Sequence, residues 1–316
     1  MAGEADFIAA LRGIARHPAA RGLIDDAAVI APPPGRDLVL THDALVEGVH
    51  YLPSCPPRDV AWKLVAVNVS DLAAKGADPI GALMGYALTG DAGWDAEFVA
   101  GLGEACAHFA LPLLGGDTVS LPPGAPRVLN LTAIGAAAPG AVPARSGAVA
   151  GDRLWVTGAI GDAGLGLRIA LGELTGPASL LDAYRRPRPD VALGRLIAPH
   201  AHAMADISDG LLIDARRMAD ASGLAVDIDL DAVPLSREAI ALAGSDRRAR
   251  LAAATAGDDY VLLIAAPATI ASICLPESAI LVPVGRFAAG AGITLHDGGG
   301  AVPLPPRLGY EHGRLP

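Results

Sequence analysis

Residues 67–77 decide the fold of this chain, and they read Val67-Asn68-Val69-Ser70-Asp71-Leu72-Ala73-Ala74-Lys75-Gly76-Ala77. Pro57 and Arg58 ahead of this segment and Gly76 within it predict a helix from Pro57 to about Lys75, because proline favours a helix start and glycine a helix end. Asp71 falls on or beside the apolar stripe of that helix. Burying a carboxylate is costly unless it is paired with a cation or bound to a metal. The segment therefore predicts a functional carboxylate on a core helix.

Four further acidic motifs are scattered over the chain: Asp25-Asp26, Thr41-His42-Asp43, Gly115-Gly116-Asp117-Thr118 and Asp206-Ile207-Ser208-Asp209-Gly210. Most of them set a carboxylate beside Gly, Ser or Thr, where a loop meets a strand or helix. Two like charges about 4 Å apart repel by about 4 kcal/mol near a protein surface, so such residues converge around cations. Carboxylates, waters and phosphate oxygens are the ligands that Mg²⁺ prefers. The set predicts a nucleotide site that holds several Mg²⁺ ions.

Each motif also has a simpler structural interpretation when it is taken alone. The Asp25-Asp26 pair is typical of a turn before a strand. Asp209 before a helix is typical of an N-cap, which stabilises a helix start by about 1 kcal/mol. Asp43 at a strand end is ambiguous, whereas Asp117 follows two glycines and has no helix to cap. Only the combination favours a metal and nucleotide site.

Composition limits the class of protein. The chain has 316 residues, 52% of them hydrophobic and 18% charged, with a net charge of −10, which indicates a globular protein and argues against a nucleic-acid partner. Cys55, Cys106 and Cys274 are far apart, which favours free thiols over a zinc site or disulfides. The N-terminus lacks the pattern of a signal peptide, and Pro267 interrupts the apolar stretch 261–275. We expect a cytoplasmic protein that does not span a membrane.

The order of patterns predicts mixed α and β structure throughout. Helical spacing covers residues 4–17, 57–75, 95–109, 164–171, 191–197 and 209–222. Strand patterns cover 27–31, 37–41, 80–88, 111–114, 128–136, 153–157, 225–230, 260–265 and segments near 280–284 and 293–295. Residues 137–151 are rich in Ala, Pro and Gly. We therefore expect an N-terminal domain over 1–137, a linker over 138–150 and a C-terminal α+β domain over 151–316.

Several common catalytic motifs are excluded. No Gly-Lys-Ser/Thr triplet is present, so the chain has no Walker A loop. The glycine-dense segment Gly158–Gly166 fails the dinucleotide pattern because Ile169 stands where the last glycine belongs, and it favours a tight turn between a strand and a helix. No histidine stands in a nucleophile-elbow context. Nucleotide binding would then depend on metals and on a residue such as Arg145.

In this order, the motifs resemble the thiamine-monophosphate kinase family. The matching segments are Asp25–Val29, Asp43–His50, Val67–Ala77, Leu114–Thr118, Arg145–Ala148, Asp206–Leu211, Gly257–Tyr260 and Gly309–His312. The resemblance extends over essentially the whole chain. Related ATP-dependent synthetases share the segment around Asp71, whereas Asp43-Ala44-Leu45-Val46-Glu47-Gly48-Val49-His50 is more specific to this family.

The resemblance implies a two-domain α+β fold of the aminoimidazole-ribonucleotide-synthetase type, dimerised through its N-terminal sheets. It implies metal ligands at Asp26, Thr41, His42, Asp43, Asp71, Asp117, Asp206 and Asp209. ATP contacts are implied at Gly116, Asp117, Arg145 and Ser208, and thiamine monophosphate contacts at His50, Asp258 and Tyr310. The implied reaction is direct transfer of the γ-phosphoryl group of ATP to thiamine monophosphate with several Mg²⁺ ions. No side chain is expected to act as a general base, because the second pKa of a phosphate monoester is about 6.

The sequence departs from the family pattern at four positions. Ile24 stands where glycine is usual, His42 where Ser or Thr is usual, and Asp258 where Glu is common. Gly313 replaces an aromatic residue. Two alternatives therefore stay open: another ATP-dependent member of the superfamily, such as aminoimidazole-ribonucleotide synthetase, and a protein that binds ATP and Mg²⁺ without catalysis.

Overall fold

Helix α2 (Pro57–Ala74) is buried over most of its length in a computed structural model that describes residues 3–277, 279–311 and 313. The chain divides into two units. Unit 1 falls within Met1–Leu72 and Ala77–Gly140, and unit 2 within Ala73–Gly76 and Ala141–Pro316. Each unit combines a sheet with helices, which confirms the α+β class. No helix of the described residues is long and apolar enough to cross a bilayer.

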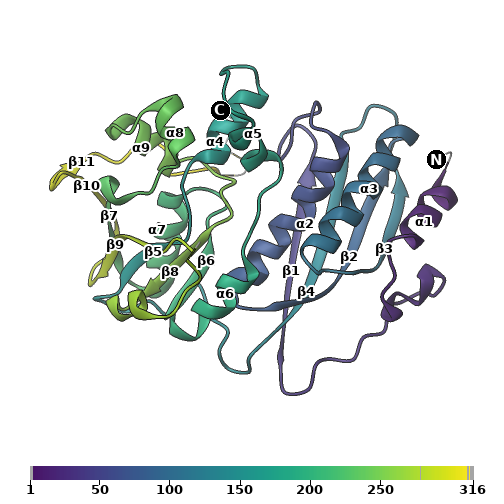
Figure 1. Cartoon of the computed structure of the whole chain (residues 1–316), viewed down its shortest axis with the longest axis horizontal. Coiled ribbons are helices and arrows are strands. Elements are labelled where there is room, and N and C mark those ends of the chain that lie inside the picture. Colours follow the sequence, from purple (N-terminus) through teal and green to yellow (C-terminus); the bar gives the residue numbers. More distant parts are fainter. Residues whose placement is uncertain (1–2, 278, 312, 314–316) are drawn as a thin grey trace. The chain divides into compact units, whose positions relative to one another are not determined.

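Unit 1 is a four-stranded sheet with helices on one face (Figure 1). Besides α2, its elements are α1 (Glu4–Arg12), β1 (Asp37–Val46), β2 (Asp78–Leu88), α3 (Ala92–His108), β3 (Leu113–Ser120) and β4 (Val128–Ala137). The strand order is β1-β4-β2-β3, with β2 and β3 parallel and the other pairs antiparallel. A methyl group on Gly135 of β4 would meet the Leu72 side chain at 2.9 Å, so α2 packs closely on the sheet. This places Asp71 against the strands.

Unit 2 is a larger mixed sheet, with strand order β11-β10-β7-β9-β5-β8-β6. The strands are β5 (Arg153–Val156), β6 (Ala203–Asp206), β7 (Ala225–Asp229), β8 (Leu262–Ala266), β9 (Val282–Ala288), β10 (Gly292–Asp297) and β11 (Gly300–Val302). The helices are α4 (Asp162–Ala170), α5 (Ala178–Arg185), α6 (Val191–Ile197), α7 (Leu211–Ser222), α8 (Arg237–Ala243) and α9 (Arg247–Ala254). Leu211, Leu212 and Met218 of α7 belong to the main apolar core of this unit. The helix predicted over 191–197 is confirmed with the same bounds as α6.

The structure corrects three local predictions. Residues 27–31 form no strand, and the prolines that follow them lack the N–H groups that a strand would need. The first helix ends at Arg12, not at residue 17, because Gly13 caps it and Pro18 follows. The Gly115–Thr118 segment lies inside β3 and is not a turn after a short strand.

Candidate functional site

Three of the predicted ligands lie together on the inner face of the unit 1 sheet. In β1, Thr41 and Asp43 alternate with exposed residues and share the face of the buried Leu45. The Thr41 hydroxyl donates a hydrogen bond to a carboxylate oxygen of Asp71 in α2. The local sequence explains the arrangement, because a strand with period two and an apolar helix bring their inward residues to one layer.

The Asp43 carboxyl is the most perturbed of these groups. Burial, and after it the negative charge of Asp71, together raise its pKa from 3.8 to about 6. In the part of the chain that the structure describes, neither carboxylate is paired with a basic side chain. Two acids that face each other without a cation form a site of negative potential. Such a site favours a bound cation.

A further oxygen lies one helical turn before Asp71. The Asn68 side chain is buried and donates to the Leu64 carbonyl at 3.0 Å, while its Oδ1 atom has no hydrogen-bond partner among the described residues. Buried acceptors without partners are rare in folded proteins. Carboxylate, hydroxyl and amide oxygens are hard donors of the kind that Mg²⁺ takes. The residues of this site therefore fit the predicted metal.

Gly116 and Asp117 lie at the opposite edge of the same sheet. The register places Asp117 beside Gly85 of β2, on the face of Leu83, whereas Asp43 faces α2. Two strands separate β1 from β3, which corresponds to about 14 Å at the usual strand spacing. Within unit 1 the fold therefore brings Asp43 and Asp71 together but does not bring Asp117 to them.

The remaining predicted residues of unit 1 are dispersed. His42 points to the outer face of the sheet, where its Nδ1 atom lies 2.8 Å from the Thr132 hydroxyl. His50 accepts a hydrogen bond from the Val46 N–H at Nδ1, at 2.9 Å, so a neutral ring carries its proton on Nε2. Asp26 is exposed and donates its N–H to the Asp25 side chain at 2.8 Å. His42 thus lies on the opposite face of the sheet from the Asp43–Asp71 pair, and Asp26 forms no preassembled metal cluster with that pair among the described residues.

Unit 2 brings together three segments that the sequence separates widely. The segment 206–209 follows β6, and both other segments bind to its backbone. Asp258 donates its N–H to the Ser208 carbonyl at 2.8 Å, and Tyr310 donates its N–H to the Asp209 carbonyl at 2.9 Å. The segments that carry Asp206, Ser208, Asp209, Asp258 and Tyr310 are therefore linked through their backbones.

Close packing at glycines makes this convergence possible. A methyl group on Gly257 would meet the Ser208 carbonyl oxygen at 2.7 Å, and one on Gly309 would meet the Asp209 carbonyl oxygen at 2.4 Å. Real side chains do not approach a backbone atom so closely. Both glycines precede a residue that is predicted to contact substrate, so they allow Asp258 and Tyr310 to lie against the 206–209 segment.

Asp258 lies in a strained loop. Its φ angle is 70° and that of Tyr260 is 51°, both in the left-handed region that side chains disfavour. The Tyr260 hydroxyl donates to the Asp258 carboxylate at 3.0 Å, and the Tyr260 N–H donates to the Ile207 carbonyl at 2.8 Å. Strain held in place by surrounding bonds is found most often at functional sites.

Asp259, between these two residues, is an important group that the sequence did not reveal. Its two carboxylate oxygens accept the Gly161 N–H, at 3.0 and 2.9 Å, just before helix α4. Burial is the main cause of a pKa well above the usual value for this carboxyl. Asp259 therefore fastens the strained loop to α4, and only its position beside Asp258 could have suggested a role.

Asp214 and Arg217 in α7 were also missed. The Asp214 carboxylate accepts the N–H groups of three consecutive residues, Ser208, Asp209 and Gly210, at 3.0 to 3.2 Å. Arg217 Nη1 lies 2.5 Å from Asp209 Oδ2 and 2.9 Å from Asp214 Oδ1. An acidic residue in the first turn of the predicted helix was the one available signal.

The backbone around Arg145 is held by contacts within unit 2. Lys75 Nζ donates to the Pro143 carbonyl at 3.1 Å, and the Met204 N–H donates to the Ala144 carbonyl at 2.9 Å. On the other side, the Ser222 hydroxyl accepts the N–H groups of the residues at 147 and 148, each at 3.2 Å. The fold thus holds both flanks of Arg145 and leaves its exposed side chain at the surface.

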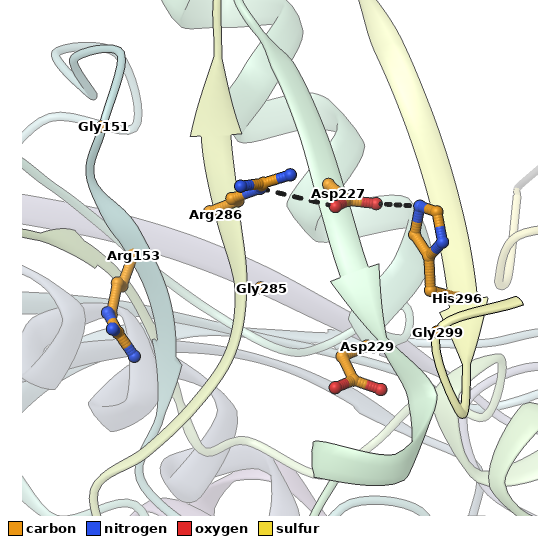
Figure 2. A pocket seen from close by; sticks show the side chains of 8 residues that line it. All are labelled: Gly151, Arg153, Asp227, Asp229, Gly285, Arg286, His296 and Gly299. Atoms are coloured by element: carbon orange, nitrogen blue, oxygen red, sulfur yellow. Dashed lines mark ion pairs between the residues drawn. The ribbon is translucent and has the colours of Figure 1, made fainter. Parts of the chain in front are cut away.

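Among the described residues, no cluster of three or more His, Cys, Asp or Glu side chains is preassembled for a metal. One cavity of about 530 Å³ lies on the unit 2 sheet, and its lining residues are Gly151, Arg153, Asp227, Asp229, Gly285, Arg286, His296 and Gly299. Figure 2 shows Arg286 and His296 on either side of Asp227, at 3.5 and 2.8 Å. The Arg286 side chain is 73% exposed, so we interpret this cavity as a solvated sheet face with weak ion pairs. None of the predicted site residues lines it.

Comparison with known proteins shows similarity over the whole length of the chain. The family model described as AIR synthase related protein, N-terminal domain, matches residues 24–137, and the corresponding C-terminal domain model matches residues 149–297. A thiamine-monophosphate kinase of Caulobacter vibrioides is 41% identical over 98% of this chain and 91% of its own.

Solved structures agree in fold with this chain. The crystal structure of thiamine-monophosphate kinase from Stenotrophomonas maltophilia superposes with a TM-score of 0.81 at 35% identity, and the match covers 94% of this chain and 96% of the other. AaThiL complexed with AMPPCP and TMP superposes with a TM-score of 0.77 at 29% identity over 89% of each chain.

Proposed function

Because this chain belongs to the thiamine-monophosphate kinase family of AIR synthase-related proteins, we propose that it transfers the γ-phosphoryl group of ATP directly to thiamine monophosphate. The products would be ADP and thiamine diphosphate. The observation that carries the proposal is the 41% identity to a thiamine-monophosphate kinase over 98% of the chain, together with the grouping of Thr41, Asp43 and Asp71 in this structure. The complex of a related structure with AMPPCP and TMP supports the same pair of substrates.

The residues of unit 1 would hold the metal side of the reaction. Asp43 and Asp71 supply two carboxylates that no basic side chain neutralises in the described structure, and Thr41 supplies a hydroxyl. Bound Mg²⁺ would neutralise the charge of the phosphates and align them for in-line transfer. Asp26, His42 and Asp117 remain predicted ligands. Among the described residues of unit 1, they do not form a metal cluster with Asp43 and Asp71.

The residues of unit 2 would hold the two substrates. In unit 2, we assign Ser208 and Arg145 to ATP, and Asp206 and Asp209 to the metal ions. Gly116 and Asp117 of unit 1 remain predicted ATP contacts. Asp258 and Tyr310, whose N–H groups bind the carbonyls of Ser208 and Asp209, are assigned to thiamine monophosphate. His50 of unit 1 remains a predicted contact of the same substrate. No general base is required, because the acceptor phosphate is already largely deprotonated at pH 7. The work of the protein is then to position the reactants and neutralise their charge.

We also propose a homodimer formed by the outer face of the unit 1 sheet. Four large apolar side chains are exposed on this face: Leu38 (48%), Leu40 (63%), Leu83 (39%) and Val119 (52%). Apolar side chains gathered on one sheet face favour burial against a partner. A cytoplasmic location stays a prediction from the sequence.

The deciding experiment is an assay of purified protein with ATP, Mg²⁺ and thiamine monophosphate, in which ADP and thiamine diphosphate are both quantified. We expect equal amounts of the two products, and none when Mg²⁺ is removed by a chelator. Turnover of an aminoimidazole-ribonucleotide precursor in a parallel assay would instead assign the chain to that synthetase. Mg²⁺-dependent ATP binding without product from either substrate would identify a binding protein that has lost catalysis.

A further inference from the structure

The carboxylate of Asp214 organises the turn that carries Asp209. Asp214 is 2% exposed and accepts the N–H groups of Ser208, Asp209 and Gly210. These donors point at one anion because the turn runs directly into the start of α7. A buried carboxylate that collects several N–H groups is held firmly in place. Asp214 therefore fixes the backbone from which the Asp209 side chain projects.

Arg217 connects this anchor to Asp209. A single nitrogen, Nη1, bridges the two carboxylates, at 2.5 Å from Asp209 and 2.9 Å from Asp214. Its neighbour Arg216 has a different environment, because it forms an ion pair with Asp220 at 3.4 Å where both side chains are 52% exposed. The two arginines carry the same charge on the same helix, but only Arg217 touches a predicted metal ligand.

We propose that Arg217 is a resident counter-ion for Asp209. It neutralises this carboxylate while no metal-bound nucleotide is present, and it thereby sets the Mg²⁺ concentration at which unit 2 binds the nucleotide. The inference rests on the proposed function, because it takes Asp209 as a ligand of the metal–nucleotide complex. A divalent cation that reaches Asp209 meets the guanidinium already bound to one of its oxygens. Like charges at this range repel, and a partly exposed site screens the repulsion only in part.

The central experiment compares Arg217→Met with Arg216→Met. Both variants remove one positive charge from α7 and keep a long apolar stem, so the general change in net charge is the same. Calorimetry measures binding of a non-hydrolysable ATP analogue as Mg²⁺ is varied. We expect Arg217→Met to lower the Mg²⁺ concentration at half-saturation by about 3- to 10-fold. Arg216→Met is expected to stay within about two-fold of the unmodified protein, since its ion pair is exposed.

A second variant separates a counter-ion from a purely structural support. Asp214→Asn keeps the shape of the side chain but replaces one carboxylate oxygen by an NH₂ group. Either the three N–H groups of residues 208–210 or the Arg217 guanidinium then face a donor in place of an acceptor. We expect it to lower the melting temperature and to raise the Mg²⁺ concentration at half-saturation. The second effect is opposite to the effect expected of Arg217→Met. Asp220→Asn is the matched control on the exposed side of α7. If both the 217 and 214 variants weaken Mg²⁺-dependent binding, Arg217 only supports the turn and the inference is overturned.

The outcomes also separate this inference from the proposed reaction. Thiamine diphosphate formation by the unmodified protein with no difference between the 217 and 216 variants overturns the inference alone. A clear shift in the Arg217→Met titration without any product from thiamine monophosphate overturns the proposed reaction and supports the inference. Absence of Mg²⁺-dependent nucleotide binding in the unmodified protein overturns both.

Discussion

The hydroxyl of Thr41 donates a hydrogen bond to the carboxylate of Asp71, and this bond ties edge strand β1 to helix α2. The bond orients the Asp71 carboxylate through Thr41, a second predicted metal ligand, before any cation is bound. The bond also explains why an acid is tolerated in a helix whose neighbouring side chains are almost all buried.

Replacement of Asp71 by Asn should abolish turnover while folding is preserved. The amide keeps the size of the side chain and can still accept the Thr41 hydrogen bond, but it removes the charge that a metal requires. We expect kcat/KM to fall by about 100-fold or more, measured as thiamine diphosphate formation. Thr41→Ser should retain activity and Thr41→Val should lose it. An Asp71→Asn protein that fails to fold would instead assign Asp71 a structural role.

The raised pKa of Asp43 predicts an unusual dependence of stability on pH. The native carboxyl has a pKa of about 6 against 3.8 in a model peptide, so the native state holds this proton more tightly than the unfolded chain. Its contribution is therefore favourable at low pH, declines as pH rises from about 4 to 6, and is fully lost above pH 6. Without Mg²⁺, Asp43→Asn should be more stable than the unmodified protein by roughly 1–2 kcal/mol at pH 7.5.

Chemical denaturation at pH 4 and pH 7.5 checks this prediction. The difference between the two proteins should become much smaller near pH 4, where native Asp43 is protonated and the unfolded carboxyl, with a pKa of 3.8, is only partly ionised. Added Mg²⁺ should stabilise the unmodified protein and have little effect on the variant. A stability difference that is the same at both pH values would show that the Asp43 charge is not the cause.

Adjacent acids in the Gly257–Tyr260 segment should respond in opposite ways. Asp258→Asn should fold normally, because Asn tolerates the left-handed backbone found there, and should raise the KM for thiamine monophosphate. Asp259→Ala removes the acceptor of the Gly161 N–H and should lower stability by about 1–2 kcal/mol. Denaturation curves and KM values for both variants test the contrast. A stability loss confined to Asp258→Asn would reverse the two assignments.

Gly309→Ala should damage the substrate side of unit 2. The added methyl group would lie 2.4 Å from both the Asp209 carbonyl oxygen and the Ile213 side chain, so the Tyr310 segment must move away. We expect the KM for thiamine monophosphate to rise by about 10-fold, with a smaller effect on the KM for ATP. Gly300→Ala is the control, because its methyl group would have ordinary contacts at 3.5 Å. Equal kinetics of the two variants would remove Tyr310 from the substrate site.

A charge on the outer face of the unit 1 sheet should prevent dimer formation. Leu40→Glu places a carboxylate where the proposed interface would bury it, at a position that is 63% exposed in the single chain. Sedimentation should show a monomer for this variant and a dimer for the unmodified protein. Leu171→Glu, at a half-exposed leucine of unit 2, should leave the dimer intact. A monomeric unmodified protein would contradict the proposal.

The parts of the fold that the sequence could predict are those with strong local signals. Pro57 and Gly76 bracket α2, and the apolar pattern between them places Asp71 on a buried helix. The same reasoning failed at Gly116, because a Gly-Gly pair favours a turn. In the structure, this glycine lies in β3, where a methyl group would come within 1.9 Å of the Met84 carbonyl oxygen. Its small size serves close strand packing, a tertiary requirement that no local pattern contains.

The sites that escaped prediction depend on contacts between distant segments. Asp258 and Asp259 are identical in type and adjacent, and only the position of Gly161, nearly a hundred residues earlier, determines which one is used as an anchor. Arg216 and Arg217 pose the same problem on α7. In both cases the direction of the backbone determines which of the two side chains makes the contact, and sequence spacing alone does not fix that direction.

The order of these segments along the chain has a consequence for protein synthesis. The Tyr310 segment binds the backbone of Asp209, which the ribosome has released about a hundred residues earlier. A partly translated chain therefore carries the predicted metal-binding carboxylates but lacks the Tyr310 segment, which we propose to contact thiamine monophosphate. On the proposed roles, such a chain would bind cations without turning over substrate. Catalytic competence would then mark a chain whose translation has passed residue 310.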